Sequence, residues 1–355
     1  MKPLQFGGVE IGLPVVLAPM AGYTDAAMRS LCLERGAGAV YTELTSAEGI
    51  RRDSKKTFQV LASGPAEHPI AGHIFGRDPK AMVKAARFIE QTGRFDWIDI
   101  NCGCPVKKVV SRGAGAALLK ELPLMGEIIA KVKSAVSLPV SVKTRIGFNS
   151  DTAGPLEIAR VVEESGADMV AVHARLARNF HGGDPDWQAL GEMKQALNIP
   201  LIGNGGVYAP ADAQRMVEVA GVDGVMVARG AIGNPWIFEQ IKNKFLAEPQ
   251  SSQSKIVQSQ RSLRLCEGYI GIQTRRDMMA EHLRRLVELN EEKQHDSGKP
   301  KKYSPEQAAC IQFRTHIPYY VKGLFDKKQL LMKLATLMSV EALLEEIDVL
   351  MEKNR

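Results

Sequence analysis

The sequence predicts an α/β protein in which a (β/α)8 TIM barrel is followed by a small all-α helical domain. In the first two-thirds of the chain, short apolar runs alternate with amphipathic stretches, as expected for βα units around a parallel sheet. Eight such units in roughly 230 residues match the usual size of a TIM barrel. No Gly-x-Gly-x-x-Gly follows the first run, which disfavours a doubly wound sheet.

Each expected strand is an apolar run that ends in small or polar residues. The strands cover residues 14–19, 39–45, 70–75, 97–101, 139–143, 169–173, 200–204 and 224–229. Helical patterns between them include residues 81–92, 124–134, 153–165 and 211–220. Polar, reactive or glycine residues gather at almost every strand end, which is where TIM barrels carry their chemistry. We therefore expect residues 1–245 to form a catalytic barrel.

The last third of the chain has a different pattern. Residues 247–260 are rich in Ser and Gln and are expected to be a linker. After them only helical periodicity remains, over residues 278–289, 305–324, 327–338 and 340–353, with a loop at 295–304. We expect residues 246–355 to form the helical domain.

Composition narrows the class of protein. The chain has 355 residues, of which 45% are hydrophobic and 24% charged, which is typical of a globular protein. It has no apolar run long enough for a membrane span and no secretion signal, so we expect a cytoplasmic protein without a membrane partner. Five cysteines do not make a disulfide framework. The net charge of +6 permits nucleic-acid binding without requiring it.

Two glycine-bearing strand ends predict a phosphate site. Asn204-Gly205-Gly206 ends the seventh strand, and Ala228-Arg229-Gly230 ends the eighth. TIM barrels often bind phosphate with the loops after these two strands. Glycine lets backbone N–H groups approach the anion, and Arg229 adds a bidentate donor. The alternative is a pair of ordinary glycine turns.

Basic residues at other strand ends are further candidates. Lys143 ends the fifth strand, where it could hold positive charge next to a ligand or form a Schiff base; the alternative is a structural salt bridge. His173 ends the sixth strand and is followed by Arg175 and Arg178. A functional histidine is favoured there over a core histidine.

The segment Cys102-Gly103-Cys104 carries the thiol candidates. Its spacing and the lack of further paired ligands argue against zinc, and no metal is expected. Cys104 opens a loop that contains Lys107, Lys108 and Arg112, which would favour an anionic substrate. A thiol is mostly protonated at neutral pH, so Cys104 could act as a proton donor.

Together these segments resemble the tRNA-dihydrouridine synthases. The resemblance is carried, in order, by Ala18-Pro19-Met20-Ala21-Gly22-Tyr23-Thr24-Asp25, Asp99-Ile100-Asn101-Cys102-Gly103-Cys104-Pro105, Gly113-Ala114-Gly115-Ala116-Ala117-Leu118-Leu119, Val142-Lys143-Thr144-Arg145-Ile146-Gly147, the His173 segment, Asn204-Gly205-Gly206, Ala228-Arg229-Gly230-Ala231, Pro235-Trp236-Ile237-Phe238 and Phe313-Arg314-Thr315-His316-Ile317. It covers nearly the whole chain.

The resemblance implies an FMN-dependent enzyme that reduces uridine in tRNA to 5,6-dihydrouridine. NADPH would reduce the flavin, the reduced flavin would pass hydride to uracil carbon 6, and Cys104 would deliver the proton to carbon 5. The sequence has no dinucleotide fingerprint, so NADH remains an alternative to NADPH. We expect a monomer, and the sequence does not specify the uridine position or the tRNA.

The resemblance also implies roles for individual residues. The implied cofactor-binding residues are Pro19, Met20, Ala21, His73, Lys143, His173, Asn204, Gly205, Gly206, Ala228, Arg229 and Gly230. Asn101 would hold the uracil or flavin edge, and Arg175 would contact substrate or phosphate. The chain departs from the family at His73, where glutamine is usual, and at Gly206, where an acidic residue is common. Residues 174–183 also follow the family pattern poorly, which leaves the roles of Arg178 and His181 open.

A basic excess in the helical domain suggests a tRNA surface. Residues 275–333 hold 13 Lys and Arg against 8 Asp and Glu, which suits phosphate contacts. The candidates are Arg275, Arg276, Arg284, Arg285, Lys299, Lys301, Lys302 and Arg314. The alternative is a solvated helical surface, and Glu281 and Glu288 are spaced to pair with Arg284 and Arg285.

Two other functions compete with this hypothesis. One is an FMN-dependent barrel oxidoreductase that acts on a small molecule, similar to dihydroorotate dehydrogenases or ene-reductases. The other is an RNA-binding or RNA-chaperone protein built on a barrel that has lost its activity. The first would not need the basic helical domain, and the second would not bind FMN.

Overall fold

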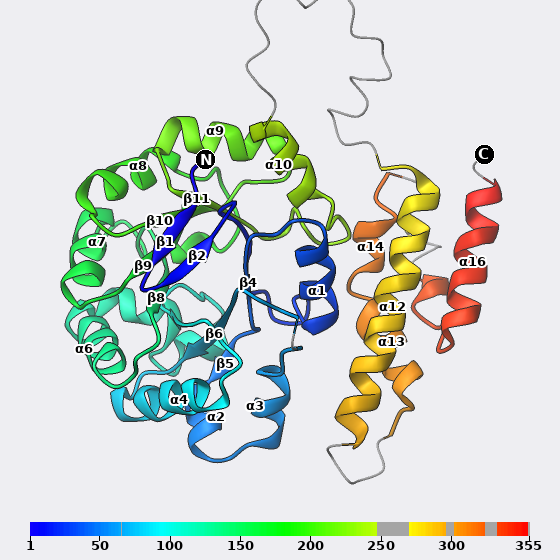
Figure 1. Cartoon of the computed structure of the whole chain (residues 1–355), viewed down its shortest axis with the longest axis horizontal. Helices are drawn as coiled ribbons and strands as arrows, with labels where there is room; N and C mark the ends of the chain where they lie inside the picture. Colours follow the sequence, from blue (N-terminus) through cyan, green and yellow to red (C-terminus); the bar gives the residue numbers. More distant parts are fainter. Residues whose placement is uncertain (65, 247–269, 296–301, 324–331, 354–355) are drawn as a thin grey trace, which may run out of the picture.

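A computed structural model describes residues 1–64, 66–246, 270–295, 302–323 and 332–353 (Figure 1). In Figure 1 a ring of helices surrounds the parallel strands, and the C-terminal helices lie to one side of this ring. The predicted fold class is confirmed: a parallel barrel is followed by a helical region. The boundary predicted at residue 245 stays a prediction, because the linker predicted at 247–260 lies outside the described residues.

The barrel strands follow one another around a single parallel sheet. Their order is β3 (Val15–Leu17), β11 (Gly224–Val227), β10 (Leu201–Asn204), β9 (Met169–His173), β8 (Val140–Arg145), β7 (Trp97–Asn101), β6 (Ile70–Phe75) and β4 (Val40–Tyr41), and β5 (Thr45–Ser46) pairs with β6. The ring closes between β3 and β4, where Leu17 N–H donates to the Ala39 carbonyl at 3.0 Å. All carboxyl ends therefore meet at one face of the barrel.

Helices cover the outside of this sheet. They are α1 (Ala26–Glu34), α2 (Ala47–Arg51), α3 (Lys55–Val60), α4 (Pro79–Thr92), α5 (Lys107–Val110), α6 (Leu122–Lys133), α7 (Pro155–Glu164), α8 (Trp187–Ala196), α9 (Pro210–Ala220) and α10 (Ile237–Leu246). Local signals set several of their ends: proline opens α4, α7 and α9, and left-handed Gly93 and Gly221 end α4 and α9. The four helices predicted within the barrel are found, with ends that differ by at most two residues.

A hairpin that the sequence pattern did not reveal closes the other end of the barrel. Strands β1 (Leu4–Phe6) and β2 (Val9–Ile11) pair antiparallel and pack against side chains that fill the barrel interior. Phe6 meets Trp97 edge-to-face, with ring centroids 5.5 Å apart. Strands of three residues are too short for a clear alternating pattern, which explains the omission.

The C-terminal region contains α12 (Ile272–His295), α13 (Pro305–Phe313), α14 (Ile317–Tyr320) and α16 (Val340–Lys353). The helix predicted over 305–324 is interrupted after Phe313. Pro318 supplies no N–H for a continuous helix, which is consistent with the break. The helix predicted over 327–338 lies partly outside the described residues, as does the loop predicted at 295–304.

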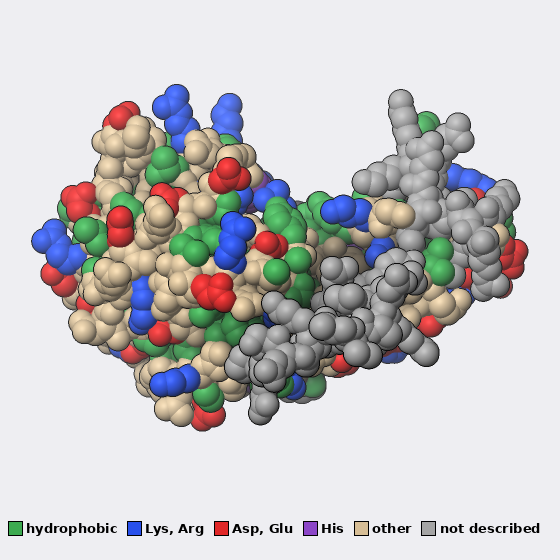
Figure 2. All heavy atoms as spheres, turned by 90° about the horizontal axis from the view of Figure 1, so that it is seen from above, with side chains coloured by type: hydrophobic (Ala, Val, Ile, Leu, Met, Phe, Trp, Pro, Cys, Tyr) green, Lys and Arg blue, Asp and Glu red, His purple; other side chains and the backbone are tan. Residues whose placement is uncertain are grey.

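Helix α1 joins the two parts. Ala27 and Leu31 of α1, together with Trp236, belong to the same buried apolar cluster as Leu283 and Phe313 of the C-terminal helices. Seen from above in Figure 2, Lys and Arg side chains are interspersed with Asp and Glu side chains over the surface of the barrel. The apolar cluster therefore holds the helical region beside the barrel.

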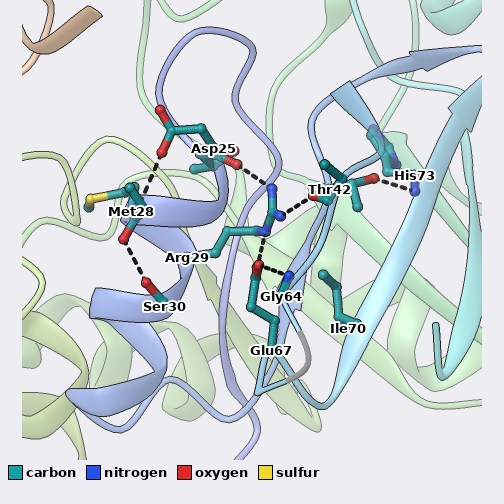
Figure 3. A network of polar contacts seen from close by, with 12 residues as sticks. Asp25, Met28, Arg29, Ser30, Thr42, Gly64, Glu67, Ile70 and His73 are labelled. Carbon is teal, nitrogen blue, oxygen red and sulfur yellow. Dashed lines mark hydrogen bonds and ion pairs between the residues drawn. The ribbon is translucent and has the colours of Figure 1, made fainter. Parts of the chain in front are cut away.

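A buried ion pair anchors α1 from its other side (Figure 3). Arg29 Nε lies 2.5 Å from Glu67 Oε2, and both side chains are almost completely buried. The same guanidinium donates to the carbonyls of Thr24 and Ala62, and Glu67 also accepts from Gly64 N–H. The guanidinium nitrogens and the carboxylate oxygens are all hydrogen-bonded, as a buried ion pair requires.

Candidate active site

A pocket of about 480 Å³ opens at the carboxyl ends of the barrel strands. This volume is in the range of small-molecule and cofactor sites. The predicted residues that line it are Pro19, Met20, Ala21, His73, Asn101, Cys104, Lys143, His173, Asn204, Gly205, Gly206, Ala228 and Arg229. The predicted residues that do not line it are Gly230, Arg175, Arg178 and Lys107, together with Arg284, Arg285 and Arg314 of the helical region. Residues scattered along 210 positions are therefore brought to one cavity, because the strand ends converge.

Cys104 lies in the loop after β7, at the pocket wall. Its thiol is half-buried, and its backbone N–H donates to Asn101 Oδ1 at 3.0 Å. Burial raises the pKa of the thiol, although Val106 N–H, Arg145 and Lys143 oppose this effect. The thiol is therefore protonated at neutral pH and can donate a proton into the pocket.

The loop around Cys104 depends on a glycine at position 115. Gly115 has a φ of +61°, and a Cβ there would lie 2.8 Å from the Cys104 carbonyl oxygen. That carbonyl accepts from Ala116 N–H at 3.0 Å. Only glycine adopts this backbone without strain and leaves room for the contact.

Lys143 projects from β8 toward the same pocket. Its Nζ lies 3.4 Å from Asn204 Oδ1. Burial lowers the pKa of Lys143 to about 8, and the nearby guanidinium of Arg145 adds to the effect. The ammonium is still mostly charged at pH 7 and supplies positive charge to the cavity.

Arg145 lines the pocket and was not among the predicted site residues. Its guanidinium donates to the carbonyls of Gly103, Leu176 and Phe180, at 3.0, 3.2 and 2.8 Å. It thus ties the Cys104 loop to the loop after β9. The sequence does contain a signal for Arg145: it lies two residues after Lys143, and residues two apart lie on the same face of a strand.

Helix α14 brings a further pocket residue that sequence reasoning missed. Tyr319 lines the pocket although it belongs to the C-terminal region. Its ring meets that of Tyr23 edge-to-face, with centroids 6.2 Å apart. The helical region is therefore part of the pocket wall, a contact that local sequence patterns do not reveal.

The glycines after β10 and β11 allow close approach of the chain. Gly205 and Gly206 have φ values of +109° and +87°. A Cβ on Gly206 would lie 2.7 Å from Pro185, and a Cβ on Gly230 would lie 2.5 Å from the Val207 carbonyl oxygen. These positions leave no space for a side chain, so bare backbone is presented at this side of the pocket.

Polar atoms without a protein partner lie next to these glycines. Among the described residues, neither His173 Nδ1 nor Arg175 Nη1 has a hydrogen-bond partner, and both atoms are buried. A Cβ on Gly205 would lie 3.3 Å from His173 Nε2 and 3.4 Å from Arg175 Nη1, so the three residues adjoin. Burial, together with Arg145, Lys143 and Arg175, lowers the pKa of His173 strongly, so its imidazole is neutral. The Arg175 guanidinium is a buried donor beside bare backbone, and the neutral His173 ring can donate from one of its nitrogens, which fits the phosphate of a cofactor.

His73 and Asn101 lie at the floor of the pocket. His73 Nδ1 is 2.5 Å from Asp99 Oδ2, and Nε2 is 3.0 Å from Asn101 Nδ2. The His73 side chain is only 1% exposed. Both ring nitrogens are thus engaged within the protein.

The basic residues predicted to contact tRNA are largely paired with protein groups. Arg284 bonds Glu281 and Glu288, while Arg285 bonds Glu281 and Glu34. The other described candidates also have partners: Arg276 bonds Asp348, Arg275 donates to the carbonyls of Ile270, Tyr320 and Lys322, Arg314 lies near Met338 and Lys302 lies over Tyr303. Lys299 and Lys301 lie outside the described residues.

Two basic candidates from the barrel lie outside the pocket lining. Arg178 belongs to a short 3-10 segment (Ala177–Asn179), and its side chain is exposed. Lys107 is exposed at the start of α5. Both remain candidates for contacts with a substrate larger than the pocket.

Neither a metal cluster nor a membrane span is found in the part of the chain that the structure describes. No group of three His, Cys, Asp or Glu side chains there could hold a metal ion. None of the described helices is long and apolar enough to cross a membrane. Cys32, Cys102, Cys104 and Cys310 are free thiols.

Known proteins resemble this chain over most of its length. The family model described as dihydrouridine synthase matches residues 16–331. A probable tRNA-dihydrouridine synthase of Aquifex aeolicus is 34% identical over 322 residues, which are 89% of each chain. The tRNA-dihydrouridine synthase B of Pseudomonas putida is 36% identical over 244 residues, covering 68% of this chain and 72% of that protein.

A solved structure supports the fold independently. Histamine dehydrogenase from Rhizobium sp. 4-9 superposes with a TM-score of 0.53 at 15% identity, over 68% of this chain and 47% of that one. At this identity the similarity concerns the fold alone. The family model, in contrast, matches in sequence across both the barrel and much of the helical region, and on that ground the chain belongs to the dihydrouridine synthase family.

Proposed function

We propose that this protein reduces uridines in tRNA to 5,6-dihydrouridine, with FMN as cofactor and NADPH or NADH as reductant. The observation that carries the proposal is the meeting of a protonated thiol, Cys104, a cationic Lys143 and the bare backbone of Gly205 and Gly206 in one pocket. Membership of the dihydrouridine synthase family supports the substrate and the reaction.

The pocket offers distinct contacts for each part of FMN. Lys143 would place its charge at the electron-rich edge of the ring, and His173 would contact the flavin from the end of β9. The residues that would lie against the ring are Pro19, Met20 and Ala21, and those that would hold the phosphate are Asn204, Gly205, Gly206, Ala228, Arg229 and Gly230. When bound and reduced by NAD(P)H, FMN would supply the hydride that adds to uracil carbon 6.

Cys104 would complete the reduction by general-acid catalysis. Negative charge builds at uracil carbon 5 as carbon 6 gains hydride, so a nearby acid lowers the barrier. The raised pKa keeps the proton on the Cys104 sulfur until it is needed. Arg145 and Lys143 stabilise the thiolate left behind, which then regains a proton from water.

The substrate has to present a single base to this pocket. A uridine in folded RNA has to leave its stack to enter a cavity at the end of a barrel. Asn101 would meet the base, and Arg175, Arg178 and Lys107 would contact the surrounding tRNA. We propose that residues 1–245 carry the chemistry and residues 246–355 bind tRNA in the cytoplasm; Tyr319 in the pocket wall supports a joint site.

A tRNA assay with a matched cysteine pair tests the proposal. Purified wild-type protein with FMN and NADPH should form dihydrouridine in tRNA that lacks it, as measured by nucleoside mass spectrometry. Cys104→Ala should keep its flavin absorbance and lose about 100-fold or more in turnover. Cys102→Ala should keep turnover, because the Cys102 thiol is buried and does not line the pocket.

Each outcome of this assay has a distinct meaning. If the wild type forms no dihydrouridine in any tRNA, the proposed function is wrong. If Cys104→Ala turns over normally, Cys104 is not the acid. Turnover of free small substrates such as dihydroorotate or an enone, without activity on tRNA, would instead support a small-molecule oxidoreductase. A protein that stays colourless after FMN addition and desalting would support an RNA-binding role.

A further inference from the structure

A chain of buried polar side chains runs beneath the pocket from Trp97 to Asn101. Trp97 Nε1–H donates to Ser141 Oγ at 3.1 Å, and the Ser141 hydroxyl donates to Asp99 Oδ1. The other carboxylate oxygen, Oδ2, faces His73 Nδ1 at 2.5 Å. Asp99 and Ser141 are completely buried. Because the carboxylate accepts, His73 Nδ1 has to carry the hydrogen.

The other end of the chain fixes the same hydrogen independently. Asn101 Oδ1 accepts from the backbone N–H groups of Cys104, at 3.0 Å, and Gly103, at 3.3 Å. The amide oxygen of Asn101 therefore faces the loop, and its NH2 group faces His73 Nε2 at 3.0 Å. Since an NH2 group only donates, Nε2 has to be a bare acceptor. Both ends thus select the neutral Nδ1–H tautomer of His73.

We propose that His73 is a positioning residue for the loop that carries Cys104. It orients the Asn101 amide, and that amide holds the Gly103 and Cys104 backbone, which sets where the Cys104 thiol points. This role replaces the cofactor contact predicted for His73, because neither ring nitrogen is left for a ligand. The catalytic consequence rests on the function proposed above for Cys104.

The tautomer matters because a hydrogen on His73 Nε2 is incompatible with the observed orientation of the Asn101 amide. A hydrogen on Nε2 would face the Asn101 NH2 group, so two donors would oppose each other. Relief would require the Asn101 amide to rotate, and its NH2 group would then face the N–H groups of Gly103 and Cys104. The backbone of β6 prevents a simple shift of His73, since its own N–H donates to Thr42 Oγ1 at 2.9 Å.

Two substitutions separate the two ends of the imidazole. The amide of asparagine reaches the place of Nδ1, so His73→Asn keeps a donor for Asp99 and loses the partner of Asn101. The amide of glutamine reaches the place of Nε2, so His73→Gln keeps an acceptor for Asn101. A purely structural role at Asp99 would favour the first variant, whereas the positioning role favours the second.

Amide hydrogen exchange of Gly103 and Cys104 in the full-length, tRNA-free protein is the direct measurement. We expect His73→Asn to accelerate exchange about tenfold or more, and His73→Gln to stay within about threefold of the wild type. Dihydrouridine turnover should fall in His73→Asn and recover in His73→Gln, with KM for tRNA unchanged. Equal exchange in the two variants, or unchanged exchange in His73→Asn, would overturn the proposal.

A second measurement uses the wild-type protein and therefore does not depend on the folding of a variant. In the wild type labelled with ¹⁵N-histidine, the His73 ring should show a protonated Nδ1 and a bare Nε2 by NMR at neutral pH. The opposite tautomer would overturn the proposal. Neither the hydrogen-exchange measurement nor the NMR measurement uses tRNA. If the wild type fails to reduce uridine, only the proposed function is refuted. The inference about His73 is still decided by the hydrogen-exchange and NMR results.

Discussion

Arg285 Nη2 of α12 lies 2.8 Å from Glu34 Oε2 of α1, which joins the helical region to the barrel by an ion pair. The same guanidinium donates to Ser30 Oγ at 2.8 Å and to Glu281 Oε1 at 2.7 Å. The Arg285 side chain is 17% exposed, against 55% for its neighbour Arg284. Two residues that look alike in the sequence thus have different surroundings.

We expect Arg285→Ala to lower the free energy of unfolding by about 1 kcal/mol, because it removes bonds across the junction. Arg284→Ala, the matched control, should change it by less than about 0.5 kcal/mol, since Arg284 is exposed and both its partners lie on its own helix. Urea unfolding of both variants measures the difference. Equal losses would show that Arg285 does not stabilise the junction.

The buried pair of Arg29 and Glu67 predicts a strongly non-additive effect (Figure 3). Arg29→Met or Glu67→Leu alone should cost about 3–5 kcal/mol, because each leaves one buried charge unpaired. The double variant should lose less than either single change. A double-mutant cycle by denaturant unfolding measures the coupling, and additive losses would contradict it.

Gly230 provides a test of the phosphate site proposed for FMN. Gly230→Ala should reduce FMN retention after desalting, since its Cβ would lie 2.5 Å from the Val207 backbone and has to displace the loop. Gly12→Ala is the matched control, because a Cβ there has nothing within 4 Å. Flavin absorbance per protein reports both. Full flavin content in Gly230→Ala would remove this loop from the proposed site.

The buried Lys143 predicts a pH-dependent stability of the flavin-free protein. Its folded-state pKa of about 8 lies below the usual 10.5, so the unfolded chain binds more protons between these values. The charged side chain therefore destabilises the fold at pH 7, and this destabilisation decreases as pH rises above 8. Lys143→Met should be more stable than the wild type at pH 7, with a smaller advantage at pH 9.

Chemical unfolding at the two pH values measures this difference. Lys80→Met serves as the control, because Lys80 is exposed and should shift stability by less than about 0.5 kcal/mol at either pH. An advantage of Lys143→Met that grows with pH would contradict the stated cause. The same variant should also lose flavin-dependent turnover if Lys143 serves the proposed site.

Local patterns were sufficient for much of the fold. The strand over 97–101 was predicted with its observed ends, and helix α4 was predicted from its amphipathic period. Both elements depend on the pattern of apolar residues close together along the chain, and this pattern can be read from the sequence. The hairpin at Leu4–Phe6 and Val9–Ile11 was not predicted, because its strands are defined by packing against the barrel interior.

The barrel, the helical region and the set of strand ends that meet at the pocket could all be predicted from the sequence, because hydrophobic period and strand order are local properties. The partner of each polar group became visible only in the folded chain. It placed Tyr319 in the pocket wall, paired Arg285 with Glu34 and enclosed His73 between Asp99 and Asn101. Hydrogen bonds and ion pairs depend on atoms a few ångströms apart in space, and those partners come from distant parts of the chain or from side-chain orientations that a pattern does not encode.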